Sequence, residues 1–165
     1  MTFVSSVPEI RIRRANRAPV RGEAARVLYW MTSARRLDWN FGLQRAVEWA
    51  RELDRPLLVL EALRCGYRWA SDRHHRFAVD GMAEHARRLR GGRTGYHPYV
   101  EPEPGAGKGL VEALAADAAV VVTDEFPAFF LPRMVEAAAA ALPVRMEVVD
   151  SNGLLPLAAT EKEHS

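Results

Sequence analysis

The amino-acid sequence predicts an α/β fold, in which helices cover both faces of a doubly wound, parallel sheet of five strands. Short apolar runs, such as the one at 27–31, carry no charge, which is typical of strands buried on both faces. Segments with the apolar spacing of helices separate these runs. Strands and helices that alternate in this way form parallel sheets through right-handed crossovers. With 165 residues, 48% hydrophobic and 27% charged, the chain fits one globular domain.

The first two strands and the helix between them follow from two apolar runs and a cap. The run at 26–31 predicts the first strand. Asn40 is a favourable N-cap, so a helix is expected from there to about residue 53. Pro56 precedes a compact apolar run at 57–60, which predicts the second strand.

A long helix and a third strand come next. Ser71 can cap a helix that runs to about residue 90, where two glycines end it. The third strand is expected at 94–100. The side chains of this helix that we expect to face the core are Phe77, Met82, Ala86 and Leu89.

The last third of the chain contains the remaining two strands. Its prolines make 101–107 a loop, and Pro132 suits the first turn of a helix. The other predicted elements are a helix at 110–116, a strand at 119–123, a helix that reaches residue 141 and a fifth strand at 144–149.

The chain divides into a basic leader at 1–25, an α/β domain at 26–157 and a polar tail at 158–165. The leader can be a solvated, partly disordered segment or an arm that contacts phosphates. Because arginine and alanine are abundant throughout, basicity favours nucleic acid only weakly, and DNA is expected to bind weakly if at all. The arginines near the start are Arg11, Arg13, Arg14, Arg17, Arg21 and Arg26.

Composition also argues against several classes of protein. Cys65 is the only cysteine, so the chain has no internal disulfide, and a reducing cytoplasm is the expected compartment. No window approaches the roughly 20 apolar residues that a membrane-spanning helix needs. The start of the chain lacks the apolar core of a secretory signal.

No motif predicts a metal site or a self-contained catalytic set. His74 and His75 are adjacent and would point about 100° apart on a helix, which disfavours a shared metal. The glycine-rich loop at 105–109 lacks the Ser or Thr that a Walker loop carries after its lysine, and no glycines follow the first strand. We therefore interpret this loop as a flexible turn before a helix.

The loops after the first, second and fourth strands are expected to meet at one edge of the sheet, where ligands bind in such folds. Trp30 and Trp39 flank this crevice and could stack on a flat ring. Arg35 would pair with an anionic group, and Asp124 or Glu125 would accept hydrogen bonds. The alternative is that these residues cap helices and line an empty crevice. The candidate ligand-binding residues are Met31, Ser33, Arg35, Glu61, Leu63, Asp124, Glu125 and Phe126.

An ordered series of short strings runs nearly from end to end of the chain. The strings are RIRRANRAPV at 11–20, YWM at 29–31, Arg35-Arg36, Asn40, EAL at 61–63, YRWASDRHHRF at 67–77, GLV at 109–111, VVTDEFP at 121–127 and VDSNGLLP at 149–156. In this order they resemble the class II cyclobutane-pyrimidine-dimer photolyases, the light-driven flavoproteins that repair DNA. The string at 67–77 is the most specific of the series.

The resemblance implies the amino-terminal α/β domain of these photolyases. In the family, this domain packs on a helical domain that binds FAD and the pyrimidine dimer. An antenna chromophore, commonly a deazaflavin or a folate, lies between the two domains and passes energy to the flavin. Because the helical domain has no counterpart here, we expect a truncated or stand-alone domain that binds no FAD and repairs no DNA by itself.

Two other interpretations stay open. The chain could be a nucleotide-binding α/β module, or it could dock to a separately encoded helical FAD domain. In a photolyase-type protein the face that meets the helical domain would be exposed here, and uncovered apolar surface promotes self-association.

Overall fold

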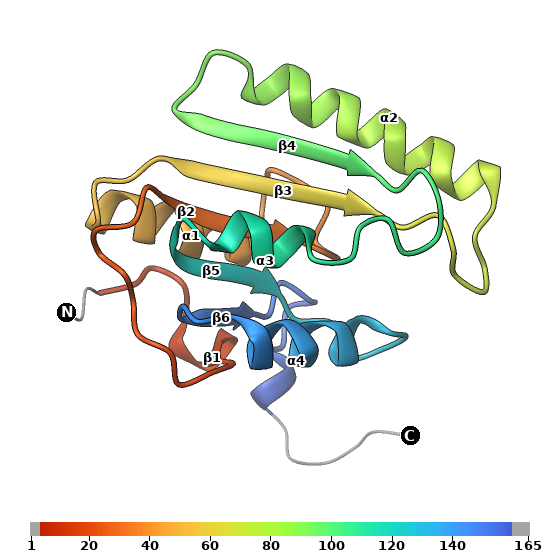
Figure 1. The fold of residues 1–165 in the computed structure, drawn as a ribbon. Coiled ribbons are helices and arrows are strands. Elements are labelled where there is room, and N and C mark those ends of the chain that lie inside the picture. Colours follow the sequence, from red (N-terminus) through yellow and green to blue (C-terminus); the bar gives the residue numbers. More distant parts are fainter. Residues whose placement is uncertain (1–3, 160–165) are drawn as a thin grey trace.

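The computed structural model describes residues 4–159 and contains one six-stranded sheet (Figure 1). The strands are β1 (Ile12–Arg14), β2 (Arg26–Met31), β3 (Leu57–Leu63), β4 (Thr94–Val100), β5 (Ala118–Asp124) and β6 (Met146–Val149). Their order is β1-β6-β5-β2-β3-β4, and every neighbouring pair is parallel except β1 and β6. The chain moves outward from β2 to β4 and then returns to the other side of β2. The switch point, where ligands bind in such sheets, therefore lies between β2 and β5.

Four helices within residues 4–159 cover the two faces of this sheet (Figure 1). The helices α1 (Phe41–Glu52) and α2 (Asp72–Leu89) lie on one face, and α3 (Leu110–Ala115) and α4 (Leu131–Ala141) lie on the other. The short 3-10 turns η1 (Glu9–Arg11) and η2 (Leu157–Ala159) contact each other near the two ends of the described chain. The predicted doubly wound α/β fold is confirmed.

The helix starts are those that the local sequence predicts. The side chain of Asn40 accepts a hydrogen bond from the Leu43 N–H at 2.9 Å, and Ser71 accepts one from the His74 N–H at 3.4 Å. These bonds satisfy N–H groups that have no partner inside a first helical turn. Pro132 stands in the first turn of α4, where its missing N–H costs nothing.

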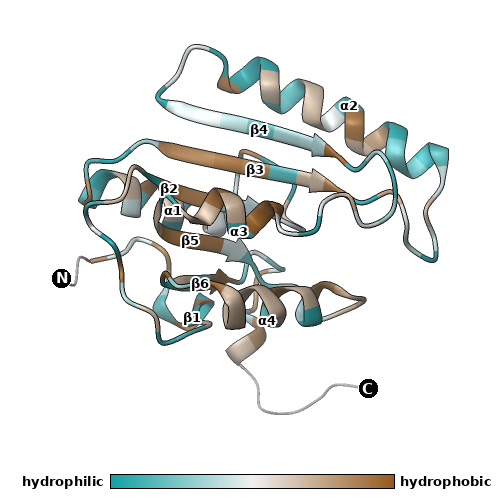
Figure 2. Ribbon diagram, viewed as in Figure 1, coloured by the Kyte–Doolittle hydropathy of each residue, from teal (hydrophilic) through white to brown (hydrophobic). Residues whose placement is uncertain are grey.

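Alternate residues of β2 build separate cores on the two faces of the sheet. Leu28 and Trp30 pack against α3 and α4, whereas Tyr29 and Met31 pack on the α1 side, and none of the four is more than 5% exposed. Figure 2 shows that β3 is mostly hydrophobic, whereas the edge strand β4 is mostly polar or neutral. The strands that flank the switch point are thus covered on both faces, as their uncharged sequences predict.

The leader contributes a strand, so the sheet has six strands and not the predicted five. β1 pairs antiparallel with β6, and Arg11 just before it is only 6% exposed. The Arg11 guanidinium donates to the carbonyl oxygens of residues 150 and 152–154 and lies 3.6 Å from the Asp150 carboxylate. The interpretation of this segment as a solvated arm is wrong at Arg11, because backbone carbonyl groups that follow β6 bind its guanidinium.

The predicted core face of α2 is partly corrected. Met82 is buried, at 3% exposure, but Phe77 is 84% exposed. The first turns of α2 project beyond the sheet (Figure 1). The apolar spacing of the sequence continues into these turns, although no strand lies beneath them. The predicted tail at 158–165 falls largely outside the described residues.

Within residues 4–159, every helix is too short or too polar to cross a lipid bilayer.

We predict that Arg11→Ala destabilises the fold far more than Arg13→Ala does. Removing one partner of a buried charge pair typically costs about 3–5 kcal/mol, so we expect a loss of that order for Arg11. Arg13 forms an ion pair with Glu125, but its side chain is 54% exposed, and such pairs contribute about 1 kcal/mol or less. Urea unfolding of both variants measures the difference, and equal losses would contradict the structural role of Arg11.

Candidate functional site

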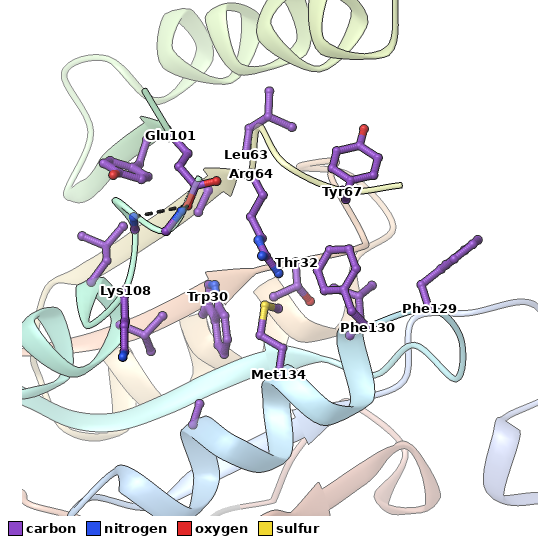
Figure 3. Close-up of a pocket in the computed structure, with 18 of the residues that line it drawn as sticks. Trp30, Thr32, Leu63, Arg64, Tyr67, Glu101, Lys108, Phe129, Phe130 and Met134 are labelled. Atoms are coloured by element: carbon purple, nitrogen blue, oxygen red, sulfur yellow. Dashed lines mark hydrogen bonds between the residues drawn. The ribbon is translucent and has the colours of Figure 1, made fainter. Parts of the chain in front are cut away.

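A cavity of about 1090 Å³ opens at the carboxyl edge of the sheet, on the face that carries α3 and α4 (Figure 3). It lies between α4, the loop that follows β3 and the loop that follows β4. α3 packs on β2 and β5, so it leaves this end of β3 and β4 without a helix above it. The sheet edge that the sequence points to therefore contains a real cavity.

The floor of the cavity is apolar. Trp30 of β2 projects toward α4, and Met134 approaches it from that helix (Figure 3). Ala62 of the neighbouring strand β3 faces the same side, and its small side chain leaves room above the sheet. An apolar floor that contains an indole is well suited to a flat ring.

Aromatic side chains gather at one side of the cavity (Figure 3). Tyr67 and Phe130 lie with their ring centroids 6.4 Å apart. Next to them, Trp69 and Phe129 meet edge to face at 5.5 Å. Trp69 is 57% exposed and Phe129 is 67% exposed, so this aromatic side continues onto the surface of the protein.

Two basic side chains and one hydroxyl provide polar groups inside this apolar frame. The Arg64 guanidinium lies 5.0 Å from the centre of the Phe130 ring, and Lys108 enters from the opposite side of the cavity (Figure 3). Within residues 4–159, no carboxylate pairs with either cation. Thr32 also lines the cavity, and its buried Oγ1 has no hydrogen-bond partner among the described residues. These groups remain available to a ligand.

Glu101 holds the glycine-rich loop in place. Its carboxylate accepts hydrogen bonds from the N–H groups of Cys65 at 3.0 Å, Gly105 at 3.0 Å and Gly107 at 3.3 Å. Burial by itself would raise the pKa of Glu101, but these N–H groups bring the pKa below its ordinary value. The loop is thus an ordered wall of the cavity. It is no phosphate cradle, because two of its N–H groups already bind a carboxylate.

Asp124, at the end of β5, ties down the loop that follows β2. One carboxylate oxygen accepts the N–H groups of residues 32, 33 and 34 at 2.8, 2.9 and 3.0 Å. The other oxygen accepts the Tyr29 hydroxyl at 2.5 Å. Burial, followed by the neighbouring Asp124 charge, raises the pKa of Tyr29 well above its ordinary value. Gly42 keeps this cluster compact, because a Cβ there would lie 3.0 Å from an Asp124 oxygen.

Glu61 forms a second buried cluster beneath the other side of the edge. It is 1% exposed and accepts hydrogen bonds from Arg35 at 3.2 Å and Tyr96 at 2.7 Å, and it lies 2.8 Å from the His85 ring nitrogen. Burial and the bond to Glu61 raise the pKa of Tyr96. Arg35 also donates to the Ala62 carbonyl at 2.6 Å, so its guanidinium is anchored on the protein.

The predicted site residues divide into those that line the cavity and those that support it. Arg35 and Leu63 line it, and Phe126 stacks on the rim residue Phe129 at 6.3 Å. The others have partners within the protein. Met31 is in the core on the α1 side, and the Ser33 N–H donates to Asp124. Glu61 forms an ion pair with Arg35, and Glu125 forms one with Arg13.

Of the two tryptophans expected to flank the crevice, Trp30 is in the cavity floor. Trp39 is 94% exposed and does not line the cavity. Its backbone has φ of 52°, which turns it into the bend before α1.

Several lining residues are absent from the predicted set. The aromatic pair at 129–130 lies in the loop that follows β5, and Lys108 belongs to the glycine-rich loop, which the sequence predicts only as a turn. Both loops lie at the edge of the sheet where the sequence predicts a ligand, and this position is the signal by which their residues could be identified. The lining residues outside the predicted set that matter most are Arg64, Tyr67, Lys108, Phe129, Phe130 and Met134.

Within residues 4–159, no group of three or more His, Cys, Asp or Glu side chains is arranged to hold a metal ion.

The sequence is similar to a deoxyribodipyrimidine photo-lyase of Methanothermobacter thermautotrophicus. The two are 32% identical over 154 residues, which are 93% of this chain and 34% of the photo-lyase. The chain thus spans about a third of the length of this relative. The similarity supports a photolyase-related α/β domain.

Among solved structures, the fold is similar to that of a universal stress protein from Archaeoglobus fulgidus. The TM-score is 0.48 at 18% sequence identity, and the match covers 76% of this chain and 97% of the other. No family model matches the chain.

We predict that Glu101→Gln loosens the glycine-rich loop, whereas Glu103→Gln does not. Glu103 is an exposed carboxylate of the same loop and so is a matched control. The variant at Glu101 loses charge-assisted bonds to the loop, so trypsin should cleave after Lys108 faster than in the wild type. Equal cleavage rates for the three proteins would contradict the role of Glu101.

The hydrogen bonds between Glu101 and the glycine-rich loop depend on pH. Because the pKa of Glu101 is lowered from 4.5, its contribution to loop stability is fully present above pH 4.5 and is lost as the pH falls through the lowered pKa. The amide resonances of Gly105 and Gly107 should therefore shift with a midpoint below pH 4.5. In Glu101→Gln this titration should be absent.

Proposed function

We propose that this chain is the α/β domain of a photolyase-type protein for light-driven repair of pyrimidine dimers in DNA, and that its cavity binds a planar antenna chromophore of the deazaflavin or folate type. The observation that carries this proposal is the cavity at the switch-point edge, with an indole in its floor and aromatic side chains at one side. Its volume of about 1090 Å³ is ample for a ligand of that size.

The residues that carry the sequence resemblance also build the cavity. The most specific string, at 67–77, contributes Tyr67, Trp69 and His74 to the lining. The YWM string contributes Trp30, and the GLV string contributes its residues at 109–111. The residues that carry the similarity to a photo-lyase and the residues that line the cavity thus overlap, which supports the proposal.

The role of this chain toward such a chromophore is to hold it. The proposed chromophore supplies light absorption and the transfer of excitation energy. Trp30 and Met134 would contact the faces of the ring, Thr32 Oγ1 would take a hydrogen bond from its polar edge, and the ordered loop held by Glu101 would keep water away. No catalytic residue is assigned here, because the proposed task is to fix a ring in position and no bond is made or broken at the cavity.

FAD and the dimer would be bound by a helical domain that acts with this one. The exposed aromatic residues Trp69 and Phe129 adjoin each other at the rim of the cavity and support such a docking surface. Exposed apolar side chains that form a patch often mark an interaction site. In the absence of that domain, the same surface favours self-association. The nucleotide-binding alternative receives less support, because Glu101 occupies N–H groups of the one glycine-rich loop at this edge.

We predict that the protein binds a deazaflavin and that Phe130→Ala weakens binding by about tenfold, since stacking of a flat ring on an aromatic side chain is worth about 1–3 kcal/mol. Trp39→Ala is the matched control, because Trp39 is exposed and does not line the cavity. Fluorescence titration with 5-deazariboflavin measures the affinity of the wild type and of both variants. If the wild type binds neither this ring nor a folate, the proposed function fails, and if both variants bind as the wild type does, the cavity is the wrong location.

Arg35→Ala is a less direct test of the site than Arg64→Ala. Arg35 is anchored to Glu61 and to a backbone carbonyl, so its removal also disturbs a buried cluster. The Arg64 side chain is exposed and lies over the Phe130 ring. We expect both substitutions to weaken binding, but only Arg35→Ala to lower the free energy of unfolding as well.

A further inference from the structure

The charges around the cavity are unequal. Five cationic side chains line it, Arg35, Arg64, Arg68, Lys108 and Arg133, against two acidic ones, Glu101 and Glu112. Arg35 is paired with Glu61, and Glu101 keeps its negative charge while it accepts three N–H groups. Four cations then stand against two carboxylates around the cavity. What remains toward the interior of the cavity is therefore mainly positive.

Two of these cations lie at different parts of the cavity. Figure 3 shows the Arg64 side chain extending from the end of β3 toward the middle of the cavity, close to Thr32 and Phe130. Lys108 lies on the other side of Trp30 and Met134 from the aromatic side chains (Figure 3). No described carboxylate pairs with either one. Both side chains are exposed, so their attraction for an anion weakens as salt is added.

The cavity therefore has two chemically different parts. The aromatic side, with Tyr67 and Phe130, suits a flat ring, and the opposite side, with Lys108, suits a negative charge. Arg64 lies between them, where its guanidinium can contact a ring face and an anion at once. A ligand that fills both parts is a ring with a charged chain.

Resting on the proposed function, we propose that the ligand is a planar ring that carries an anionic tail, either a phosphate or a carboxylate, and that Lys108 and Arg64 bind this tail. The ring occupies the aromatic side, and the tail runs along the floor past Trp30 toward Lys108. The tail sets the affinity and the direction in which the ligand lies. The ring without its tail is the weaker ligand.

Matched pairs of compounds test the inference. 5-Deazariboflavin and its 5′-phosphate differ by one phosphate. Pteroamide, the uncharged amide of pteroate, and folate differ by the glutamate with its two carboxylates. Because a charged hydrogen bond adds to the affinity, the tailed member of at least one pair should bind about tenfold more tightly at low salt. A gain in the first pair identifies a phosphate tail, and a gain in the second identifies a carboxylate tail. The advantage should shrink as NaCl is added.

Variants assign the effect to residues. Lys108→Ala and Arg64→Ala should each reduce the advantage of the tailed compound, while Lys108→Arg, which keeps the charge, should retain it. Arg51→Ala is the control, because Arg51 is an exposed residue of α1 on the opposite face of the sheet. Since all of these side chains are exposed, the unfolding midpoints should match that of the wild type.

The outcomes separate this inference from the proposed function. If ring and tailed compounds bind equally in both pairs, the anionic tail is refuted while the chromophore cavity stands. If the tailed compounds bind more tightly but Lys108→Ala and Arg64→Ala leave the advantage intact, the assignment to these two residues is wrong. If no compound binds, both proposals fail together.

Discussion

The carboxylate of Asp124 is buried beside the switch point of the sheet, and the geometry of the site depends on it. It joins the end of β5 to the loop after β2 through three N–H groups and to β2 itself through the Tyr29 hydroxyl. A buried carboxylate is stable only when its oxygens are hydrogen-bonded, so each of these bonds is required by the burial. These bonds fix the loop that carries Arg35, and they place the Arg35 guanidinium at the cavity.

The same edge of the sheet therefore has two different halves. On the α1 face, Asp124, Tyr29 and Asn40 fill the space with a closed hydrogen-bonded cluster. On the opposite face, the short helix α3 leaves β3 and β4 uncovered near Trp30, and the cavity opens there. The proposed ligand would therefore lie on the α3 and α4 face, because the polar groups of the cluster on the α1 face already bond to one another.

Acidic side chains at this edge stabilise the protein, and basic ones face the cavity. Glu61, Glu101 and Asp124 all turn inward and bind N–H or cationic groups of the chain itself. Arg64 instead extends into the cavity, and Lys108 lines its opposite side. This division leaves a positively charged space lined by aromatic rings, which is the physical basis for proposing an anionic planar ligand in a photolyase-related domain.

The sequence by itself determined the α/β class, the helix caps at Asn40 and Ser71 and the edge of the sheet where the cavity lies, because periodicity and capping are local properties. Only the tertiary structure decided which side chains face the cavity. Lys108 and Phe130 reach it through loops whose paths depend on bonds between distant residues, such as the one from Glu101 to Cys65. The strand in the leader was hidden for the same reason, since nothing near Arg11 in the sequence reveals the carbonyl groups at 150–154 that bury it.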